Sequence, residues 1–473
     1  MSDTENSPHL PIEDFRNYGY QLVDWLAEYF SNIESQRILP EITPGDIRAM
    51  LPDVAPEQAE DMSDIIADLD RVVMPGMAHW QHPGWFAFFP SGVSPVSVLG
   101  EFVAAGLATQ GMMWSTAPSP TEIENTVLDW LVDLLGLPST WRIDTGPGGG
   151  VLQMSASDST HLSLAIARHH AVEAGHATDS LVAYGSEQAH SSIEKGARIA
   201  GYRHIRSIRV DESFALDVNA LEDQVEADLA SGLVPTWVCS AVGTTSTTAM
   251  DPIRPIAAVA KDHGMWHHAD AAYAGSAMIC PEFRNLQDGV ELVDSYTFNP
   301  HKWLLTNFDC SVFWAADRTK LIDALSILPA YLKNESSGDP AAIDYRDWHV
   351  PLGRRFRALK LWFVLRSYGA EKLRDFVRSH VDWAKELEDR IQADGRFEVT
   401  APRTLALVCF RHVGGNDLTK SLADAVNASG TAYVTPSTID DTQFIRVSIG
   451  STWTERHHVD ALWDLIDLHG TPA

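Results

Sequence analysis

The middle of the chain alternates between short apolar runs and segments whose apolar residues recur at helical spacing. Runs typical of buried strands lie at 181–184, 237–242, 265–268, 296–298 and 311–314. Apolar positions three and four residues apart predict a helix that ends before Gly136 and Pro138. Thr121 and Glu124 have capping-box spacing and predict its start. Such alternation predicts a mostly parallel sheet covered by helices.

The two ends of the chain have other patterns. The residues up to about 94 read as helices, and the apolar stripe over 15–33 is wider than one core-facing helix face needs. That helix either packs on its own domain or is shared with a second subunit. The C-terminal part predicts a helix over 370–392, strands at 406–410 and 444–449, and a helix over 454–468. We expect three parts: a helical segment 1–94, a large domain 95–369 and a small α/β domain 370–473.

Charge and composition exclude several classes of function. Lys and Arg number 35 and Asp and Glu 64, so the net charge is −29. A field of that sign repels phosphate backbones and anionic lipids, so we expect no nucleic-acid or membrane partner. No apolar run is long enough to span a bilayer, and the polar, acidic start lacks the pattern of a signal peptide.

Cysteines and histidines predict neither disulfides nor a metal site. Four cysteines lie far apart without a CxxC pair, at positions 239, 280, 310 and 409, which favours a reducing, cytoplasmic setting. His263 and His267 are four residues apart, but His267 falls in a predicted strand, where such side chains lie too far apart to share a metal. The pairs 169–170 and 457–458 are expected on helix surfaces.

A nucleotide fold is the alternative of a different class. The stretch 146–150 is rich in glycine, yet Val151 breaks the GxGxxG register, and neither a Walker A motif nor HExxH occurs. A nicotinamide-dependent oxidoreductase is therefore permitted by the α/β pattern but not favoured.

Polar residues gather after the predicted strands, where open α/β sheets bind ligands. These segments contain His190, Thr245, Asp270, Asn299, His301 and Lys302. Lys302 precedes the apolar stretch 303–305, and desolvation of a lysine lowers its pKa and makes it a better nucleophile. Such a lysine could bind an aldehyde covalently.

The other strand-end residues complete the needs of one cofactor. Asp270 could keep a pyridine nitrogen protonated, and His190 could stack on the ring. The turn 148–157 opens a helix predicted from about Ser159 to Glu173, and it could bind a phosphate through backbone N–H groups helped by Ser157. Together these are the requirements of pyridoxal 5′-phosphate.

At these residues the sequence resembles the aromatic L-amino-acid decarboxylases, the group II pyridoxal-phosphate-dependent decarboxylases. The blocks that carry the resemblance are 74–80, 268–276, 298–305, 307–310 and 351–356. It implies the α/β fold of type I pyridoxal-phosphate transferases, with a mostly parallel, seven-stranded-type sheet in the large domain and a small C-terminal α/β domain. It also implies that segment 1–94 is a helical flap swapped across a homodimer, with each active site shared between subunits.

The resemblance assigns roles to residues. The cofactor residues it implies are Ala156, Ser157, His190, Thr245, Asp270, Asn299, His301 and Lys302. Lys302 would bind the cofactor, Asp270 would pair with its pyridine nitrogen, and His190 would stack on the ring. Tyr331, in a loop that closes over the site in the family, would donate a proton to the carbon that loses CO2.

The same resemblance implies an aromatic pocket for the substrate. Its residues are Trp80, Phe88, Phe89, Pro90, Ser91, Gln110, Met112, Phe308 and Gly353. Phe88 stands where animal relatives often have Tyr, and Gln110 and Met112 replace larger apolar or aromatic residues. Gly353 favours the wider indole ring, because plant relatives with phenolic substrates carry Ser there.

The function implied is decarboxylation of an aromatic L-amino acid to its arylalkylamine and CO2. The candidates are tryptophan or 5-hydroxytryptophan, DOPA, tyrosine and phenylalanine. The alternative in the same fold is an aromatic acetaldehyde synthase, whose members replace the loop tyrosine or the stacking histidine, whereas this chain keeps Tyr331 and His190. Arg446 is a candidate to bind the substrate carboxylate, or else a structural salt-bridge residue.

Overall fold

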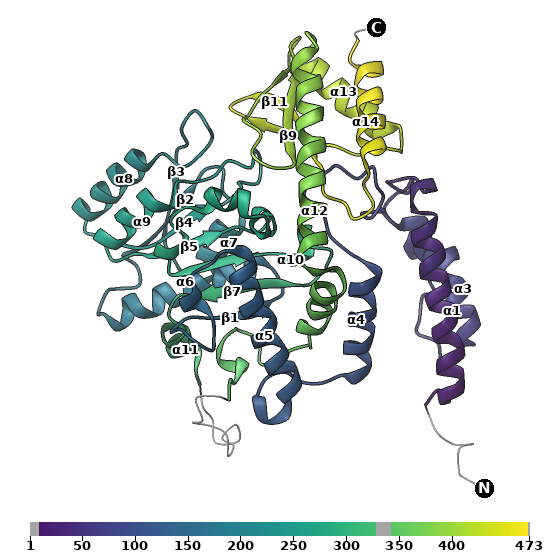
Figure 1. Cartoon of the computed structure of the whole chain (residues 1–473), viewed down its shortest axis with the longest axis horizontal. Helices are drawn as coiled ribbons and strands as arrows, with labels where there is room; N and C mark the ends of the chain where they lie inside the picture. The colour runs from purple at the N-terminus through teal and green to yellow at the C-terminus, as the bar shows by residue number, and fades with distance from the viewer. Residues whose placement is uncertain (1–8, 328–341, 472–473) are drawn as a thin grey trace.

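The computed structural model describes residues 9–327 and 342–471, and its centre is a seven-stranded sheet (Figure 1). The strand order is β1-β7-β6-β5-β4-β2-β3. The bounds are β1 Gly149–Gln153, β2 Leu181–Ser186, β3 His204–Ile208, β4 Val234–Ala241, β5 Trp266–Asp270, β6 Ser295–Phe298 and β7 Ser311–Ala315. As far as the structure describes this sheet, only β7 runs antiparallel to its neighbours, so the prediction of a mostly parallel sheet is confirmed.

Helices cover this sheet and bury its strands. The bounds are α4 Pro95–Leu107, α5 Pro118–Leu135, α6 Ala156–Glu173, α7 Ser192–Ile199, α8 Val218–Ala230, α9 Ile253–Asp262, α10 Pro300–Trp303 and α11 Arg318–Leu325. Every residue of β1, β2, β6 and β7 is buried, as expected of strands with helices on both faces. In the described residues, no helix is long and apolar enough to cross a membrane.

Two predicted helix starts are wrong. Thr121 is not an N-cap, because α5 begins at Pro118 after Ala117, and the Thr121 hydroxyl donates to the Ala117 carbonyl within the helix over 2.9 Å. Proline at the first helical position suits its fixed φ and missing N–H. The next helix begins at Ala156 rather than Ser159, because the hydroxyl of Ser155 accepts the N–H of Asp158 in a capping box.

The sequence did not predict four strands. Two of them, β1 and β3, belong to this sheet, and the other two, β8 Phe397–Val399 and β10 Thr435–Ile439, belong to a second sheet in the C-terminal part. β1 begins in the glycine-rich stretch, where small residues pack under bulky ones; a Cβ on Gly150 would lie 2.6 Å from the Trp314 indole nitrogen. β3 is the edge strand and is only half-buried, so it lacks an apolar run.

The N-terminal helices stand at one side of the molecule (Figure 1). They are α1 Ile12–Ser31, α2 Asp46–Met50 and α3 Met62–Asp68. None of the twenty residues of α1 is buried. The helix carries four exposed large apolar residues, Ile12, Phe15, Tyr20 and Val23. The C-terminal half of the stripe is partly covered, because Tyr29 contacts His79 and Phe30 contacts Trp453, but its first half finds no cover within the described part of this chain.

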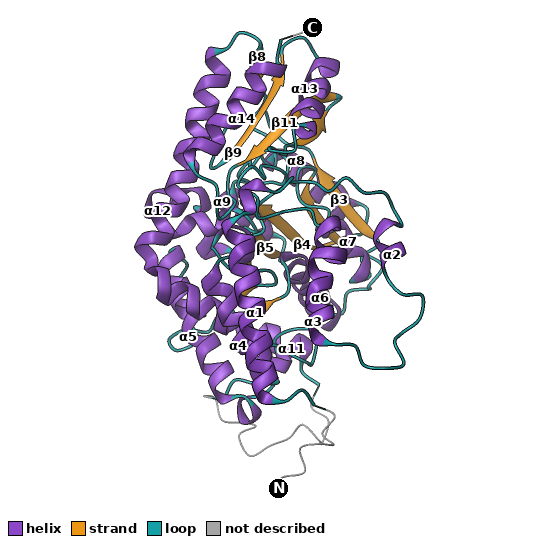
Figure 2. Ribbon diagram, turned by 90° about the vertical axis from the view of Figure 1, so that its right-hand side faces the viewer, coloured by secondary structure: helices purple, strands orange, loops and turns teal. Residues whose placement is uncertain are grey.

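The C-terminal part forms a second, antiparallel sheet of order β10-β11-β9-β8, at the top of Figure 2 with α13 and α14 beside it. Its strands are β8 Phe397–Val399, β9 Leu407–His412, β10 Thr435–Ile439 and β11 Thr442–Ser448, and its helices α13 Asn416–Ala428 and α14 Arg456–His469. The long α12, Ala358–Ala393, contains Gly369 in a left-handed conformation, so the helix predicted from 370 is its second half. The boundaries at 94 and 369 stay a prediction.

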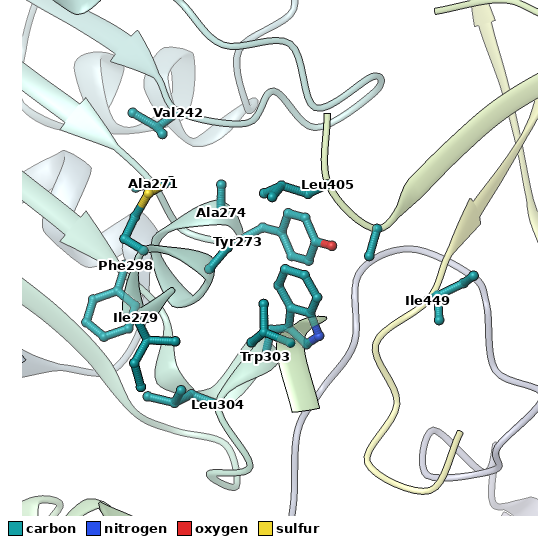
Figure 3. Close-up of a cluster of buried hydrophobic side chains, with 14 of the residues drawn as sticks. Val242, Ala271, Tyr273, Ala274, Ile279, Phe298, Trp303, Leu304, Leu405 and Ile449 are labelled. Atoms are coloured by element: carbon teal, nitrogen blue, oxygen red, sulfur yellow. The ribbon is translucent and has the colours of Figure 1, made fainter. Parts of the chain in front are cut away.

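A shared apolar core joins the two sheets behind the site (Figure 3). The rings of Tyr273 and Trp303 stack with centroids 4.9 Å apart, and Leu405 and Ile449 of the C-terminal part belong to the same cluster. Because Trp303 directly follows Lys302, this packing holds the backbone of the lysine rigidly.

Candidate active site

A cavity of about 210 Å³ lies at the carboxyl ends of the central strands. It is lined by Ala156, Ser157, His190, Thr245, Asp270, Asn299, His301 and Lys302, together with Phe89 and Phe308. All the residues predicted to hold the cofactor therefore meet in one place, although they come from five separate segments of the chain. The parallel strands explain this, because their carboxyl ends open on the same edge of the sheet.

Lys302 lies on the short helix α10, directly after β6. Its backbone N–H donates to the carbonyl of Asn299 over 3.0 Å, and its Nζ lies 5.3 Å from the centre of the Phe89 ring. Burial lowers the pKa of Lys302, and the nearby carboxylate of Asp270 opposes this in part. The lowered pKa increases the neutral amine fraction, which is the form that attacks an aldehyde.

Asp270 is the last residue of β5, and the loop that follows the strand fixes its side chain. Its Oδ1 accepts the backbone N–H of Ala272 over 2.9 Å. Its negative charge raises the pKa of both His190 and Lys302 against the effect of burial. It is therefore the anion of the cavity, placed to stabilise a positive charge there.

His190 follows β2 and faces the cavity ahead of α7. Its Nδ1 accepts the backbone N–H of Ser192 over 3.1 Å. Desolvation lowers the pKa of His190, the Asp270 carboxylate opposes this shift, and Lys302 adds to it, so the neutral form of the ring is favoured. A neutral ring with one free face is suited to stack on a flat ligand.

His301 has a supporting position. Its Nδ1 accepts the backbone N–H of Cys310 over 2.9 Å, and its ring contacts that of Phe308 with centroids 4.6 Å apart. Burial lowers the pKa of His301 to about 3. The residue thus ties the segment after Lys302 back to α10 without carrying charge.

The N-terminus of α6 forms a cradle for an anion. Ser155 caps the helix, Ala156 and Ser157 are its first two residues, and the hydroxyl-bearing Thr245 lies on another wall of the cavity. The first N–H groups of a helix lack partners within it and point toward a ligand, and the helix dipole favours negative charge.

Arg446 reaches the site from β11. Its Nε donates to the carbonyl of Ser246 over 2.9 Å and its Nη2 to that of Thr245 over 2.8 Å. The guanidinium lies 5.3 Å from the centre of the Phe89 ring. No carboxylate pairs with it among the described residues, so the salt-bridge interpretation is not supported.

The predicted substrate residues divide into three places. Phe89 and Phe308 line the main cavity. Trp80 and Phe88 stack on one another with ring centroids 5.6 Å apart, near Tyr433, while Pro90 and Ser91 follow in sequence. Gln110 and Gly353 line a separate cavity of about 480 Å³, and Met112 lines neither cavity. Tyr331 lies outside the described residues.

Sequence reasoning missed several residues that line the cavity. They are Ser155, Ala241, Gly243, Thr244, Ala272 and Tyr273. Each lies within four residues of a residue that was predicted, and the Ser-x-x-Asp spacing of 155 and 158 was a readable capping signal. Tyr273 gave no such signal, because its role depends on stacking against Phe89 with centroids 4.2 Å apart.

Residues 44–413 match the family model described as the pyridoxal-dependent decarboxylase conserved domain. The chain belongs to this family. L-tyrosine/L-DOPA decarboxylase 2 of Lophophora williamsii is 41% identical, over 98% of this chain and 94% of that protein. Phenylacetaldehyde synthase of Arabidopsis thaliana is 43% identical, over 96% and 95%. The crystal structure of Oryza sativa TDC with PLP and tryptamine superposes with a TM-score of 0.96 at 39% identity, over 98% and 99%.

This membership confirms the fold type and the cofactor. The chain is a pyridoxal-phosphate-dependent decarboxylase of fold type I. The nicotinamide-dependent oxidoreductase is thereby rejected. The relatives include both amine-forming decarboxylases and aldehyde synthases. Membership of the family therefore does not by itself decide whether the product is the amine or the aldehyde.

The residues present in the cavity fit pyridoxal phosphate. An anionic phosphate matches the α6 cradle, an aldehyde matches the amine of Lys302, and a protonated pyridine nitrogen matches the carboxylate of Asp270. The buried Oδ1 of Asn299 has no hydrogen-bond partner within the described residues, which is the state of a polar atom awaiting a ligand.

Replacing Asp270 with Asn tests the proposed pyridine partner. We expect kcat to fall by about 100-fold, because an amide does not stabilise a protonated ring nitrogen, while the cofactor still binds. Steady-state kinetics and cofactor absorbance measure this. The matched control is Asp294→Asn, since the Asp294 carboxylate also accepts a backbone N–H, that of His267, but lies in a different cavity. Equal effects in the two variants would contradict the role.

Proposed function

We propose that the enzyme decarboxylates an aromatic L-amino acid to its arylalkylamine and CO2. The observation that carries the proposal is the meeting of a desolvated Lys302, the Asp270 carboxylate and a neutral His190 in one cavity walled by Phe89 and Phe308. Aromatic walls suit a flat side chain through area and stacking. Relatives named for tyrosine, DOPA and tryptophan support the same substrate class.

Bound pyridoxal phosphate supplies an aldehyde that takes up an amine and a ring that withdraws electrons from the carbon losing CO2. In our proposal Lys302 holds that aldehyde until the amino acid displaces it. Asp270 keeps the ring nitrogen protonated, and the α6 cradle with Ser157 holds the phosphate. His190 covers one face of the ring and excludes water from it.

Arg446 is the proposed partner of the substrate carboxylate. Its Nε and Nη2 are already engaged with the Ser246 and Thr245 carbonyls, which fixes the plane of the guanidinium beside Phe89. That leaves Nη1 to contact a carboxylate. Burial lowers the pKa of Arg446, but guanidinium stays charged at neutral pH.

Tyr331 is the proposed donor of the proton that replaces CO2. The support is the family resemblance of its loop. The tyrosine in the described lining, Tyr273, has its ring packed between Phe89 and Trp303. A donor that protonates the carbon promptly makes the amine, and one that fails lets O2 react instead.

We propose a homodimer in which the partner completes each site. Phe102 and Leu107 on α4, Phe15 on α1 and Phe308 at the cavity are all exposed in the single chain. Large apolar side chains that are exposed in a single chain are the kind of surface that a partner subunit covers. Gln110 and Gly353 line a cavity apart from Lys302, and in our proposal they contact the substrate in the partner's site.

We also propose a reducing, cytoplasmic setting. The four cysteines are free and buried, and burial raises the pKa of the thiols, to about 12 for Cys310 and Cys409. Buried neutral thiols remain reduced without a disulfide framework.

A product assay tests the function. The enzyme loaded with pyridoxal phosphate is given tryptophan, 5-hydroxytryptophan, DOPA, tyrosine and phenylalanine in turn, and amine, CO2, aldehyde and hydrogen peroxide are quantified. We expect amine and CO2 in equal amounts, with the indole substrates preferred because Gly353 leaves room. Aldehyde with peroxide would make the enzyme an aldehyde synthase, and no product from any of the five would reject an aromatic substrate.

A further inference from the structure

Ser192, the first residue of α7, contacts the ring of His190 at Nδ1 and fixes its orientation. The backbone N–H of Ser192 donates to Nδ1 over 3.1 Å, and the Oγ of Ser192 lies 2.9 Å from the same nitrogen. A backbone N–H can only donate, so Nδ1 must keep its lone pair. The single proton of the neutral ring is therefore on Nε2, and the hydroxyl of Ser192 donates to Nδ1 as well.

The same contact disfavours the charged ring. A protonated histidine carries hydrogen on both nitrogens, so its Nδ1–H would face the N–H of Ser192 instead of accepting from it. Ser192 is buried and opens the helix, whose positive end repels a cation at this point. The hydrogen-bond geometry and the helix end thus act in one direction, toward a neutral ring.

Other charged groups face His190 from several elements. Asp270 at the end of β5 favours the protonated ring, and Lys302 on α10 disfavours it. His190 also borders a second cavity, whose charged residues are Glu187, Glu194 and Arg206. Arg206 forms an ion pair with Asp228, and Glu194 forms one with Arg198. Among the described residues, Ser192 makes both of the contacts to Nδ1.

We propose that Ser192 is a positioning residue for the decarboxylation: it holds His190 as the neutral Nε2–H tautomer, which presents one hydrogen-bond donor to the reacting amino acid. The role rests on the proposed function, since it acts through His190. Ser192 itself contacts Nδ1 of His190 but does not line the cavity that contains Lys302. Activity then requires a neutral His190 and falls as the pH drops through its pKa.

Three variants of the holoenzyme separate positioning from mere packing. Ser192→Ala removes a donor to Nδ1, so His190 becomes easier to protonate. We expect the acidic limb of the kcat profile to move up by about one pH unit, and kcat at neutral pH to fall about fivefold with a smaller change in KM. Ser192→Thr keeps the hydroxyl and should restore both. Ser191→Ala, at the exposed neighbouring serine whose side chain makes no capping bond, should match the wild type.

A second readout does not depend on turnover. Nitrogen NMR of the holoenzyme labelled at histidine, with the His190 signals identified by their loss in His190→Gln, reports which ring nitrogen carries the proton. We expect the Nε2–H tautomer in the wild type and a higher pKa of His190 in Ser192→Ala. An Nδ1–H tautomer, or a Ser192→Ala variant with unchanged pKa and acidic limb, would overturn the proposal. If the tautomer is as expected and no aromatic amino acid is decarboxylated, the proposed function fails on its own.

Discussion

Replacing Lys302 with Ala is expected to lower the rate of amine formation by about 10⁴-fold or more, because no other amine in the cavity can take its place as nucleophile. Lys302 is the one lysine in the described lining of the cavity. The variant should also lose the visible absorbance that pyridoxal phosphate acquires when a lysine binds its aldehyde. Spectra and product assays on the same preparation measure both effects.

The control for this variant is Lys320→Ala. The Lys320 side chain is half-exposed and its Nζ lies over the Trp266 ring, in a cavity at the other end of the sheet. It should keep wild-type absorbance and activity. A Lys302→Ala enzyme that retained turnover within tenfold of the wild type would reject the assignment of the nucleophile.

Replacing Tyr331 with Phe is expected to change the product. Without the phenol proton, amine formation should fall by about 100-fold, the size of effect typical for loss of a general acid. Dioxygen then competes for the electrons left when CO2 departs, so the substrate carbon is oxidised to aldehyde while O2 is reduced to hydrogen peroxide and the amino group leaves as ammonia. Aldehyde, ammonia and peroxide in equal amounts would be the signature.

The matched control is Tyr368→Phe, which removes a phenol from α12 without touching the cavity lining. It should yield amine alone, at the wild-type rate. If Tyr331→Phe also yields only amine at the wild-type rate, Tyr331 is not the proton donor, and His190 becomes the group to test. The assay under nitrogen distinguishes a slow proton donor from loss of binding, because aldehyde requires O2.

Sequence reasoning placed the buried strands well and the helix starts poorly. The apolar runs at 181–184 and 311–314 became β2 and β7 because a buried strand must be apolar along its whole length. Helix starts depend on single contacts, such as the Ser155–Asp158 capping box or Pro118 at the first turn of α5, and several nearby residues fit the same pattern. The edge strand β3 carries no apolar run, so periodicity could not show it.

The sequence alone was enough to single out the chemistry. Lys302, Asp270 and His190 were marked by their positions after predicted strands and by the residue types that pyridoxal phosphate needs. These signals are local, because a polar residue that directly follows an apolar run can be recognised in the amino-acid sequence without the fold. The family blocks around them identified the fold type for the same reason.

Only the tertiary structure decided what surrounds those groups. The enclosure that lowers the pKa of Lys302 comes from Phe89 and the C-terminal part, more than a hundred residues away in either direction. Ser192 donates a hydrogen bond to Nδ1 of His190, and Gln110 and Gly353 lie apart from the main cavity. Neither arrangement can be read from the spacing of these residues along the sequence. Desolvation and hydrogen-bond geometry are set by contacts between distant segments, so they exist only once the chain has folded.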